Sequence, residues 1–192
     1  MPDLPQVLPI ERVRAGARWM RIHIRGKEPL WFGPATGSPP VNRFDDPNGE
    51  FRVCYLGTTI EACFAETFLR NPPVRVLTIS DLASRCIATL AVRREVRLVS
   101  LHGAGLARIG FTAEIAAERS YERSQALSRA IWKHRDRPDG IAYRSRHDHS
   151  ALCIALFDRA GAHLQSAGSA SLVDDPQLLG RILNRYALGL TR

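Results

Sequence analysis

The sequence predicts a single α/β domain, spanning residues 1–192, in which helices flank a central mixed β-sheet. The chain has 192 residues, 45% of them hydrophobic, which is enough for one domain with a substantial core. Strand-like runs alternate with helix-like patterns along it. The runs that suggest strands are 18–24, 51–56, 74–79, 95–101, 141–143 and 151–157. We expect the core within about 18–160 and a C-terminal helix at about 174–190.

Residues 18–24 (RWMRIHI) alternate between apolar and polar side chains, which predicts a strand with Arg21 and His23 on one face. A solvated strand face is the alternative. The following segment, 33–48, is rich in Gly, Pro, Asn and Asp, which predicts a loop that folds over the surface. Arg43, beside Phe44 in this loop, suits a phosphate or carboxylate ligand, and a surface salt bridge is the other reading.

The rest of the chain is arranged around residues 51–70, FRVCYLGTTIEACFAETFLR. Its apolar first part predicts a strand, Gly57 a turn, and the two threonines that follow a helix N-cap, so a helix begins near Ile60. Glu66 then falls among apolar helix residues. It is either a surface or arginine-paired carboxylate, or a catalytic or ligand-binding one. The strand-turn-helix unit allows Tyr55 and Glu66 to share a cleft.

The middle of the chain predicts two further helices. Ser80 and Asp81 resemble the cap of a short one, and 112–134 reads as the longest helix, with Thr112 as its N-cap. Three glycines between 103 and 110 match a dinucleotide fingerprint only loosely, and we discount it.

A polar cluster at 144–149 (RSRHDH) follows the predicted strand 141–143 and suggests a loop near a ligand. Ser145 with neighbouring His and Asp residues raises a hydrolase interpretation, which the lack of a G-x-S-x-G elbow disfavours. His147 and His149 alone do not make a metal site, and we expect them to be solvated loop histidines.

Composition bears on partners and location. The net charge is +8 and arginine dominates the basic residues, which suits nucleic acid, a pyrophosphate or an acidic protein. The basic residues are spread along the chain without a base-reading motif, so direct nucleic-acid binding is the weak alternative. The N-terminus has no leader-like pattern and no run is long enough to span a membrane, so we expect a soluble, cytoplasmic protein. The cysteines should be reduced core thiols: Cys54, Cys63, Cys86 and Cys153.

Four motifs, in this order and over residues 18–157, resemble the RES-domain family, named for its arginine, glutamate and serine. They are MRIH around Arg21, NRF at Arg43, YLGTTIEACFAETF from Tyr55 and DGIAYRSR at Ser145. Members are typically toxins of bacterial toxin-antitoxin pairs with an Xre/MbcA/ParS-type antitoxin. They have an ADP-ribosyltransferase-like fold and degrade NAD+ by hydrolysis or phosphorolysis, and some are described as protein ADP-ribosyltransferases.

The resemblance implies roles for five residues. Arg21 and Arg43 would contact the pyrophosphate or the nicotinamide-ribose side of NAD+, and Tyr55 would border the nicotinamide. Glu66 would be the main catalytic carboxylate, and Ser145 would hydrogen-bond the ligand. Ile22 departs from members that have a tyrosine after the first arginine, and His23 is a possible substitute for that ring.

The chain is therefore expected to be an NAD+ phosphorylase or glycohydrolase that acts as a toxin. NAD+ is its substrate, inorganic phosphate a possible co-substrate, and no metal is expected. A cognate antitoxin is the expected partner, with a carboxylate reaching Arg21 or Arg43, and a homo-oligomer is possible. Two alternatives stay open: a protein ADP-ribosyltransferase that uses NAD+, and a non-enzymatic basic nucleic-acid-binding module.

Overall fold

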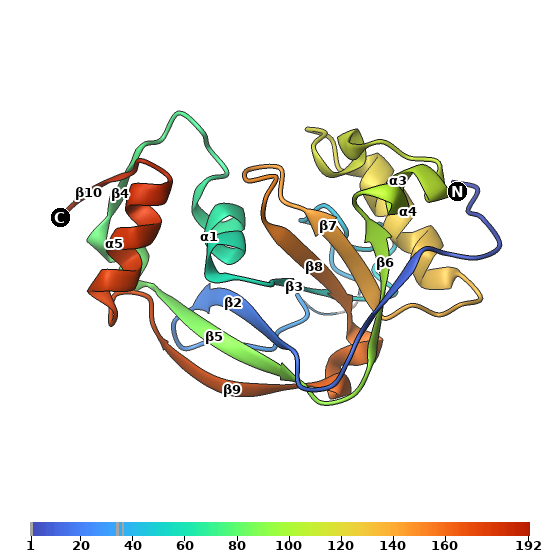
Figure 1. Ribbon diagram of the computed structural model, residues 1–192, viewed down its shortest axis with the longest axis horizontal. Helices are drawn as coiled ribbons and strands as arrows, with labels where there is room; N and C mark the ends of the chain where they lie inside the picture. The colour runs from blue at the N-terminus through green and yellow to red at the C-terminus, as the bar shows by residue number, and fades with distance from the viewer. Residues whose placement is uncertain (1, 34, 36) are drawn as a thin grey trace.

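The protein has a strongly curved, mixed eight-stranded sheet in a computed structural model that describes residues 2–33, 35 and 37–192 (Figure 1). The strands lie in the order β1-β6-β7-β8-β3-β2-β5-β9, with β6 and β7 parallel and the other neighbours antiparallel. Their bounds are β1 Ile10–Val13, β2 Arg18–Ile24, β3 Val53–Gly57, β5 Arg85–Val92, β6 Val96–Leu101, β7 Gly140–Arg144, β8 Leu152–Phe157 and β9 Leu164–Ser171. The predicted α/β class with a central mixed sheet is confirmed.

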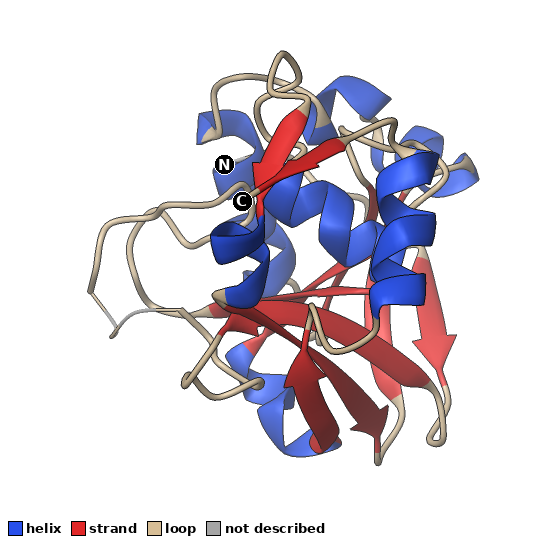
Figure 2. Cartoon of the chain, turned by 90° about the vertical axis from the view of Figure 1, so that its left-hand side faces the viewer, coloured by secondary structure: helices blue, strands red, loops and turns tan. Residues whose placement is uncertain are grey.

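Helices lie mainly along one side of this sheet (Figure 2). They are α1 Ile60–Phe68, α2 Ile79–Ala83, α3 Ala104–Ile109, α4 Glu122–Lys133 and α5 Pro176–Arg185, with 3-10 turns η1 Ala113–Ala116 and η2 Asp158–His163. A separate two-stranded parallel sheet joins β4 Val76–Thr78 to β10 Gly189–Thr191. None of the helices in the described part of the chain is long and apolar enough to cross a membrane.

The sheet divides into two halves between β2 and β3. β2 pairs with β5 along its whole length, but with β3 only through Met20 and Gly57. In Figure 1, α1 and α5 lie beside the β2-β5-β9 half, and α3 and α4 lie beside the β6-β7 half. The separation of β2 from β3 leaves room for side chains from both halves to meet.

Three hydrophobic clusters follow from this division. One packs α3, η1 and α4 on β6, β7 and β8, with Phe44 and Leu127 at its centre. A second fills the concave space between the half-sheets around Trp19 and Leu156. The third packs α1, α2 and α5 against β2 and β5 around Phe64. Alternation along β2 explains the split, because Trp19 faces the second cluster while its neighbour Met20 faces the third.

The predicted helix at 112–134 is wrong in its first half. The chain forms η1, then an irregular stretch, and α4 begins only at Glu122. The backbone carbonyls of Ile115 and Glu118 accept hydrogen bonds from the Arg43 guanidinium, at 3.4 and 2.8 Å, so they do not serve an α-helix. Thr112 makes no side-chain cap there.

Two other helix boundaries also differ from the prediction. The short helix after β4 is capped by Thr78, which accepts from the Asp81 amide at 3.0 Å, and not by Ser80 or Asp81. The C-terminal helix ends at Arg185, short of residue 190, because Ala187 takes a positive φ of 49° and the chain turns into β10. The loop at 33–48 does not lie wholly on the surface, since Phe44 is fully buried.

Candidate active site

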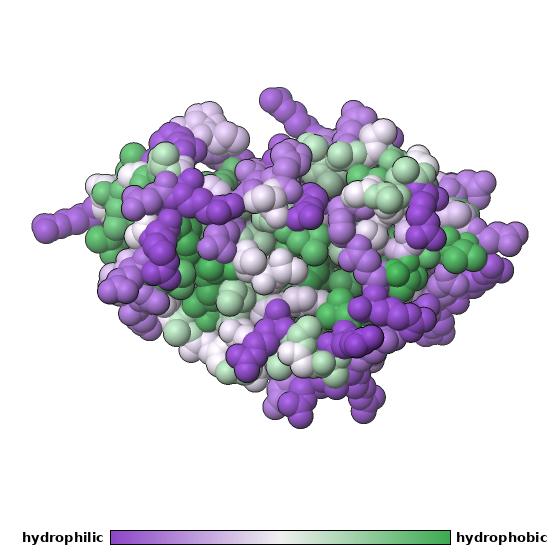
Figure 3. Space-filling view, viewed as in Figure 1, coloured by the Kyte–Doolittle hydropathy of each residue, from purple (hydrophilic) through white to green (hydrophobic). Residues whose placement is uncertain are grey.

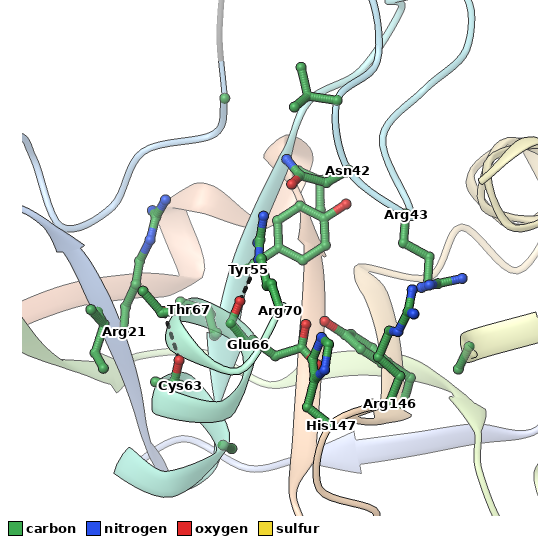
Figure 4. A pocket seen from close by; sticks show the side chains of 18 of the residues that line it. Arg21, Asn42, Arg43, Tyr55, Cys63, Glu66, Thr67, Arg70, Arg146 and His147 are labelled. Carbon is green, nitrogen blue, oxygen red and sulfur yellow. Dashed lines mark hydrogen bonds between the residues drawn. The ribbon is translucent and has the colours of Figure 1, made fainter. Parts of the chain in front are cut away.

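A cavity of about 470 Å³ lies where the two half-sheets separate, bounded by α1, the loop after β2 and the turn after β7 (Figure 4). This volume is typical of small-molecule sites. The charged and aromatic side chains that line it are Arg21, Trp31, Arg43, Tyr55, Glu66, Arg70, Tyr121, Tyr143, Arg146 and His147. The predicted shared cleft for Tyr55 and Glu66 is confirmed.

The strand-turn-helix unit from β3 to α1 sets the position of Glu66. Thr59 is the N-cap of α1 and accepts from the Ala62 amide at 3.2 Å. A Cβ at Gly57 would lie 2.8 Å from Cys63 Sγ, so only glycine lets the strand approach the helix this closely. Glu66 follows nearly two helical turns after the cap and extends into the cavity.

Glu66 carries the one carboxylate among the described residues that line the cavity. Its Oε1 is buried and has no hydrogen-bond partner among the described residues. Arg70 Nε donates to the Glu66 backbone carbonyl at 2.6 Å rather than to its side chain. A buried carboxylate oxygen without a partner is costly, and such groups gather at functional sites. The geometry favours the ligand-binding interpretation of Glu66 over the surface one.

Arg43 enters the cavity from the loop opposite α1 and is only 7% exposed. Its guanidinium lies over the Tyr121 ring, 4.6 Å from the centroid. The Glu118 carbonyl accepts from both Arg43 and Arg146, so two guanidinium groups meet at one oxygen. Burial lowers the pKa of Arg43, the Tyr121 ring opposes this, and the nearby Arg146 charge lowers it further. Two cations held together in this way form a receptor for an anion.

Polar residues on the buried face of α4 fix the loop that carries Arg43. Gln125 donates to the Asn42 carbonyl at 3.0 Å and Ser128 to the Phe44 carbonyl at 2.7 Å. Arg129 Nη1 donates to both oxygens of the fully buried Asp46 carboxylate, at 2.7 and 3.0 Å. These contacts hold the loop backbone on both sides of Arg43, so its side chain is placed before any ligand binds.

The hydroxyl of Tyr55 is used structurally. It donates to Asp45 at 2.9 Å and accepts from the Phe44 amide at 2.9 Å. Burial raises its pKa well above 10, and the Asp45 charge adds to this effect. The ring of Tyr55 is therefore fixed at the cavity wall, in a position where a planar ligand group would contact it.

Arg21 reaches the cavity from β2, on the other side of Glu66 from Arg43 and Arg146 in Figure 4. Its Nη1 lies 2.8 and 2.7 Å from the carbonyls of Pro29 and Trp31. Ile22 also lines the cavity, whereas His23 lies outside it and bonds Ser169 on β9 at 2.9 Å. His23 therefore does not replace the ring that Ile22 lacks, and the solvated-face alternative for Arg21 and His23 does not hold.

Ser145 is fully buried and lies behind the cavity wall rather than in it. Its Oγ accepts from the amides of His147 and Asp148, at 3.0 and 3.3 Å, and so shapes the turn between β7 and β8. The predicted ligand contact of Ser145 stays a prediction. In the structure its hydroxyl positions the turn that carries Arg146 and His147.

The expectation that His147 is a solvated loop histidine is wrong. The turn brings it into the cavity, where burial lowers its pKa below 6.5 and the Glu66 charge opposes that shift. Burial thus favours the neutral form of the imidazole. His149, two residues on, is exposed and does not line this cavity.

Asp148 ties the same turn to the C-terminal helix. Its Oδ2 accepts from the Tyr186 hydroxyl at 2.8 Å and from Arg185 at 3.3 Å. The Tyr186 ring stacks on Phe64 of α1, with centroids 5.9 Å apart and planes 3° from parallel. The turn that bears His147 and the helix that bears Glu66 are thus joined through Tyr186.

No metal site is evident in the described part of the chain, where no three His, Cys, Asp or Glu side chains are grouped to hold an ion. The four cysteines are free thiols, as predicted. Burial raises the pKa of Cys54 to about 11 and that of Cys63 to about 12, so both stay protonated at neutral pH.

Sequence reasoning missed four of the lining side chains: Trp31, Arg70, Tyr121 and Tyr143. Arg70 was open to inference, because it lies four residues after Glu66 at helical spacing. The others come from distant parts of the chain and meet Glu66 only through the tertiary fold. Figure 3 shows hydrophilic side chains at many separate places along the edge of this face, with hydrophobic ones between them.

Known proteins resemble this chain in sequence and in fold. The family model described as RES domain matches residues 11–175. The chain is 33% identical over 110 residues to the "Probable toxin y4kH" of Sinorhizobium fredii (strain NBRC 101917 / NGR234), covering 57% of this chain and 86% of that protein.

The fold of this chain is similar to that of a chain in the crystal structure of the M. tuberculosis MbcT-MbcA toxin-antitoxin complex. The TM-score is 0.66 and the identity 15%, over 90% of this chain and 92% of that one, so this likeness concerns the fold. The family model covers most of the chain, and the chain belongs to the RES domain family.

Proposed function

We propose that this protein is the toxin of a toxin-antitoxin pair and that it cleaves the nicotinamide-ribose bond of NAD+. The similarity to a protein named as a probable toxin and the likeness to a toxin-antitoxin complex support the first part. The observation that carries the second is the Glu66 carboxylate, which lines a cavity together with several arginines and whose buried Oε1 has no partner among the described residues.

The chemistry of the bond explains why a carboxylate belongs there. When the bond between nicotinamide and ribose breaks, its electron pair leaves with the nicotinamide, and positive charge builds on the ribose. Glu66 stabilises that charge and accepts a hydrogen bond from a ribose hydroxyl. Water or a phosphate oxygen then bonds to the ribose carbon, giving ADP-ribose and a proton, or the ADP-ribose phosphate.

The arginine side chains supply the positive charge that binds the diphosphate. Arg43 and Arg146 converge on one side of Glu66, and the Nε and Nη2 atoms of Arg21 make no hydrogen bond to a described residue. Guanidinium groups bind phosphate oxygens in pairs, so they hold the substrate while the fixed Tyr55 ring borders the nicotinamide. Phosphate as the attacking group is compatible with the same cations.

The test is NAD+ consumption by the purified chain, with and without inorganic phosphate, and with products identified by mass. Nicotinamide release is expected from the wild type. Free ADP-ribose would indicate hydrolysis, and its phosphate ester phosphorolysis. A labelled protein acceptor would instead indicate ADP-ribosyl transfer. Intact NAD+ together with steeply salt-dependent binding to DNA or RNA would overturn the proposal in favour of a nucleic-acid-binding module.

The toxin role has its own test in cells. Expression of the wild-type chain should stop growth and lower the cellular NAD+ content, and Glu66→Gln should do neither at equal protein level. An Xre/MbcA/ParS-type antitoxin that protects cells should also block NAD+ cleavage by the purified chain. Protection without any effect on NAD+ would contradict the proposed activity.

A further inference from the structure

Trp31 is a large aromatic side chain that stays 52% exposed while it lines the cavity. Most large apolar side chains of the described residues are buried in the three clusters. Binding of a flat apolar group would explain why an indole stays exposed to solvent at a charged cavity.

The backbone presents this ring rather than leaving it loose. Leu30 and Phe32, on either side of it, pack against the cluster between the half-sheets. Trp31 lies between these two residues and lines the cavity instead. The carbonyls of Pro29 and Trp31 both accept from Arg21 Nη1. The backbone that carries the indole is therefore held in place before a ligand arrives, which lowers the entropic cost of stacking on the ring.

The same contact places the ring next to a phosphate-binding group. Arg21 uses Nη1 for the carbonyls, which leaves Nε and Nη2 for an anion. A phosphate on Arg21 would lie beside the Trp31 backbone, so a base attached to that phosphate would lie within reach of the indole. Glu66 and Tyr55 occupy the part of the cavity where we have proposed that the nicotinamide end binds.

We infer that Trp31 stacks on the adenine base of NAD+ and determines the preference for the dinucleotide over its nicotinamide-containing half. This inference rests on the proposed function. Stacking of a base on an aromatic side chain changes affinity by about 5- to 150-fold, so the loss of the ring should be visible in kinetics.

The kinetic test compares two substrates. Trp31→Ala should lower kcat/KM for NAD+ by about 10-fold through KM, and leave kcat/KM for nicotinamide mononucleotide, which lacks adenosine monophosphate, unchanged. Trp31→Phe should recover most of the loss because it keeps a ring. Leu190→Ala, an exposed apolar residue on β10, is the control for surface truncation. Equal losses with both substrates, or no loss with either, would overturn the inference.

A binding test separates this inference from the proposed function. Adenosine monophosphate should bind the wild-type chain in a calorimetric titration, and Trp31→Ala should weaken it by about 10-fold or more. Equal binding by both proteins would overturn the role of Trp31 even if NAD+ is cleaved. Selective weakening would support it even if cleavage proves to need another acceptor.

Discussion

The hydrogen bond between Tyr186 and Asp148 is predicted to stabilise the turn that carries Arg146 and His147. Tyr186→Phe removes the hydroxyl that Asp148 accepts at 2.8 Å and keeps the ring on Phe64. The change removes the hydroxyl's hydrogen bond to a charged group together with its longer contact, at 3.3 Å, to the Glu61 backbone carbonyl.

Its magnitude follows from what surrounds the carboxylate. Hydrogen bonds to charged groups contribute about 1.5–3 kcal/mol. Asp148 is 13% exposed at its side chain and keeps its bonds from Ser150 and Arg185, which favours the lower end. We expect the free energy of unfolding to fall by about 1.5 kcal/mol, and Tm to fall by about 3–6 °C for a chain of this size.

The effect should depend on pH in a defined direction. Burial raises the pKa of Asp148, but hydrogen bonds from Ser150, Tyr186 and Arg185 outweigh it and lower the pKa from 3.8 to about 2. A carboxyl with a lowered folded-state pKa stabilises the fold above its unfolded value, and loses that effect as pH falls. The stability difference between wild type and Tyr186→Phe should thus be full above about pH 4, and shrink toward pH 2.

The assay is urea unfolding at pH 7 and at intervals down to pH 2, with a double-mutant cycle that adds Asp148→Asn. Tyr121→Phe is the matched control, because the Tyr121 hydroxyl makes no hydrogen bond to a described residue. The reasoning is refuted if Tyr186→Phe unfolds like the wild type at pH 7, or if the cycle gives no coupling between Tyr186 and Asp148.

Three further predictions concern the loop and the cavity. Arg129→Ala should lower the free energy of unfolding in urea by about 3 kcal/mol, because it leaves the Asp46 carboxylate buried without its cation; a loss below about 1 kcal/mol would contradict a buried pair. His147 should titrate by NMR with a midpoint below 6.5, since burial lowers its pKa, and a midpoint above 6.5 would show that the Glu66 charge dominates. Arg43→Ala should raise KM for NAD+ at least about 10-fold, as expected when a charged phosphate contact is lost, and an unchanged KM would exclude Arg43 from substrate binding.

Local signals made much of the fold predictable. The alternation in β2, the apolar run of β3 and the cap at Thr59 each act within a few residues, and each appears where the sequence places it. β9 was not predicted because its residues LQSAGSAS carry no apolar pattern. It is a strand through its pairing with β5, an interaction between segments that no local window contains.

The failure of the helix at 112–134 has a similar cause. Its sequence is compatible with a helix, but Arg43, about 70 residues earlier, bonds the carbonyls that the helix would need. A side chain from a distant loop thus determines the local structure. Helix propensity depends on the residues of the segment itself and does not include such a contact.

The candidate site was partly predictable for the same reasons. Tyr55 and Glu66 share one strand-turn-helix unit, so local spacing brings them together. Arg146 and His147 join them only because the β7–β8 turn folds back toward α1. Ser145 matches the sequence motif, but in the structure it lies behind the cavity wall and does not line the cavity. A motif gives the position of a residue in the chain and not its position in the fold.

The most direct test of the central claim compares Glu66→Gln with the wild type at saturating NAD+, measuring nicotinamide release and NAD+ binding on the same preparations. Glu61→Gln, which removes a carboxylate from the first turn of the same helix outside the cavity, is the control. The account predicts that Glu66→Gln binds NAD+ but releases nicotinamide at least about 100-fold more slowly, while Glu61→Gln behaves like the wild type. Nicotinamide release by Glu66→Gln at the wild-type rate would contradict it.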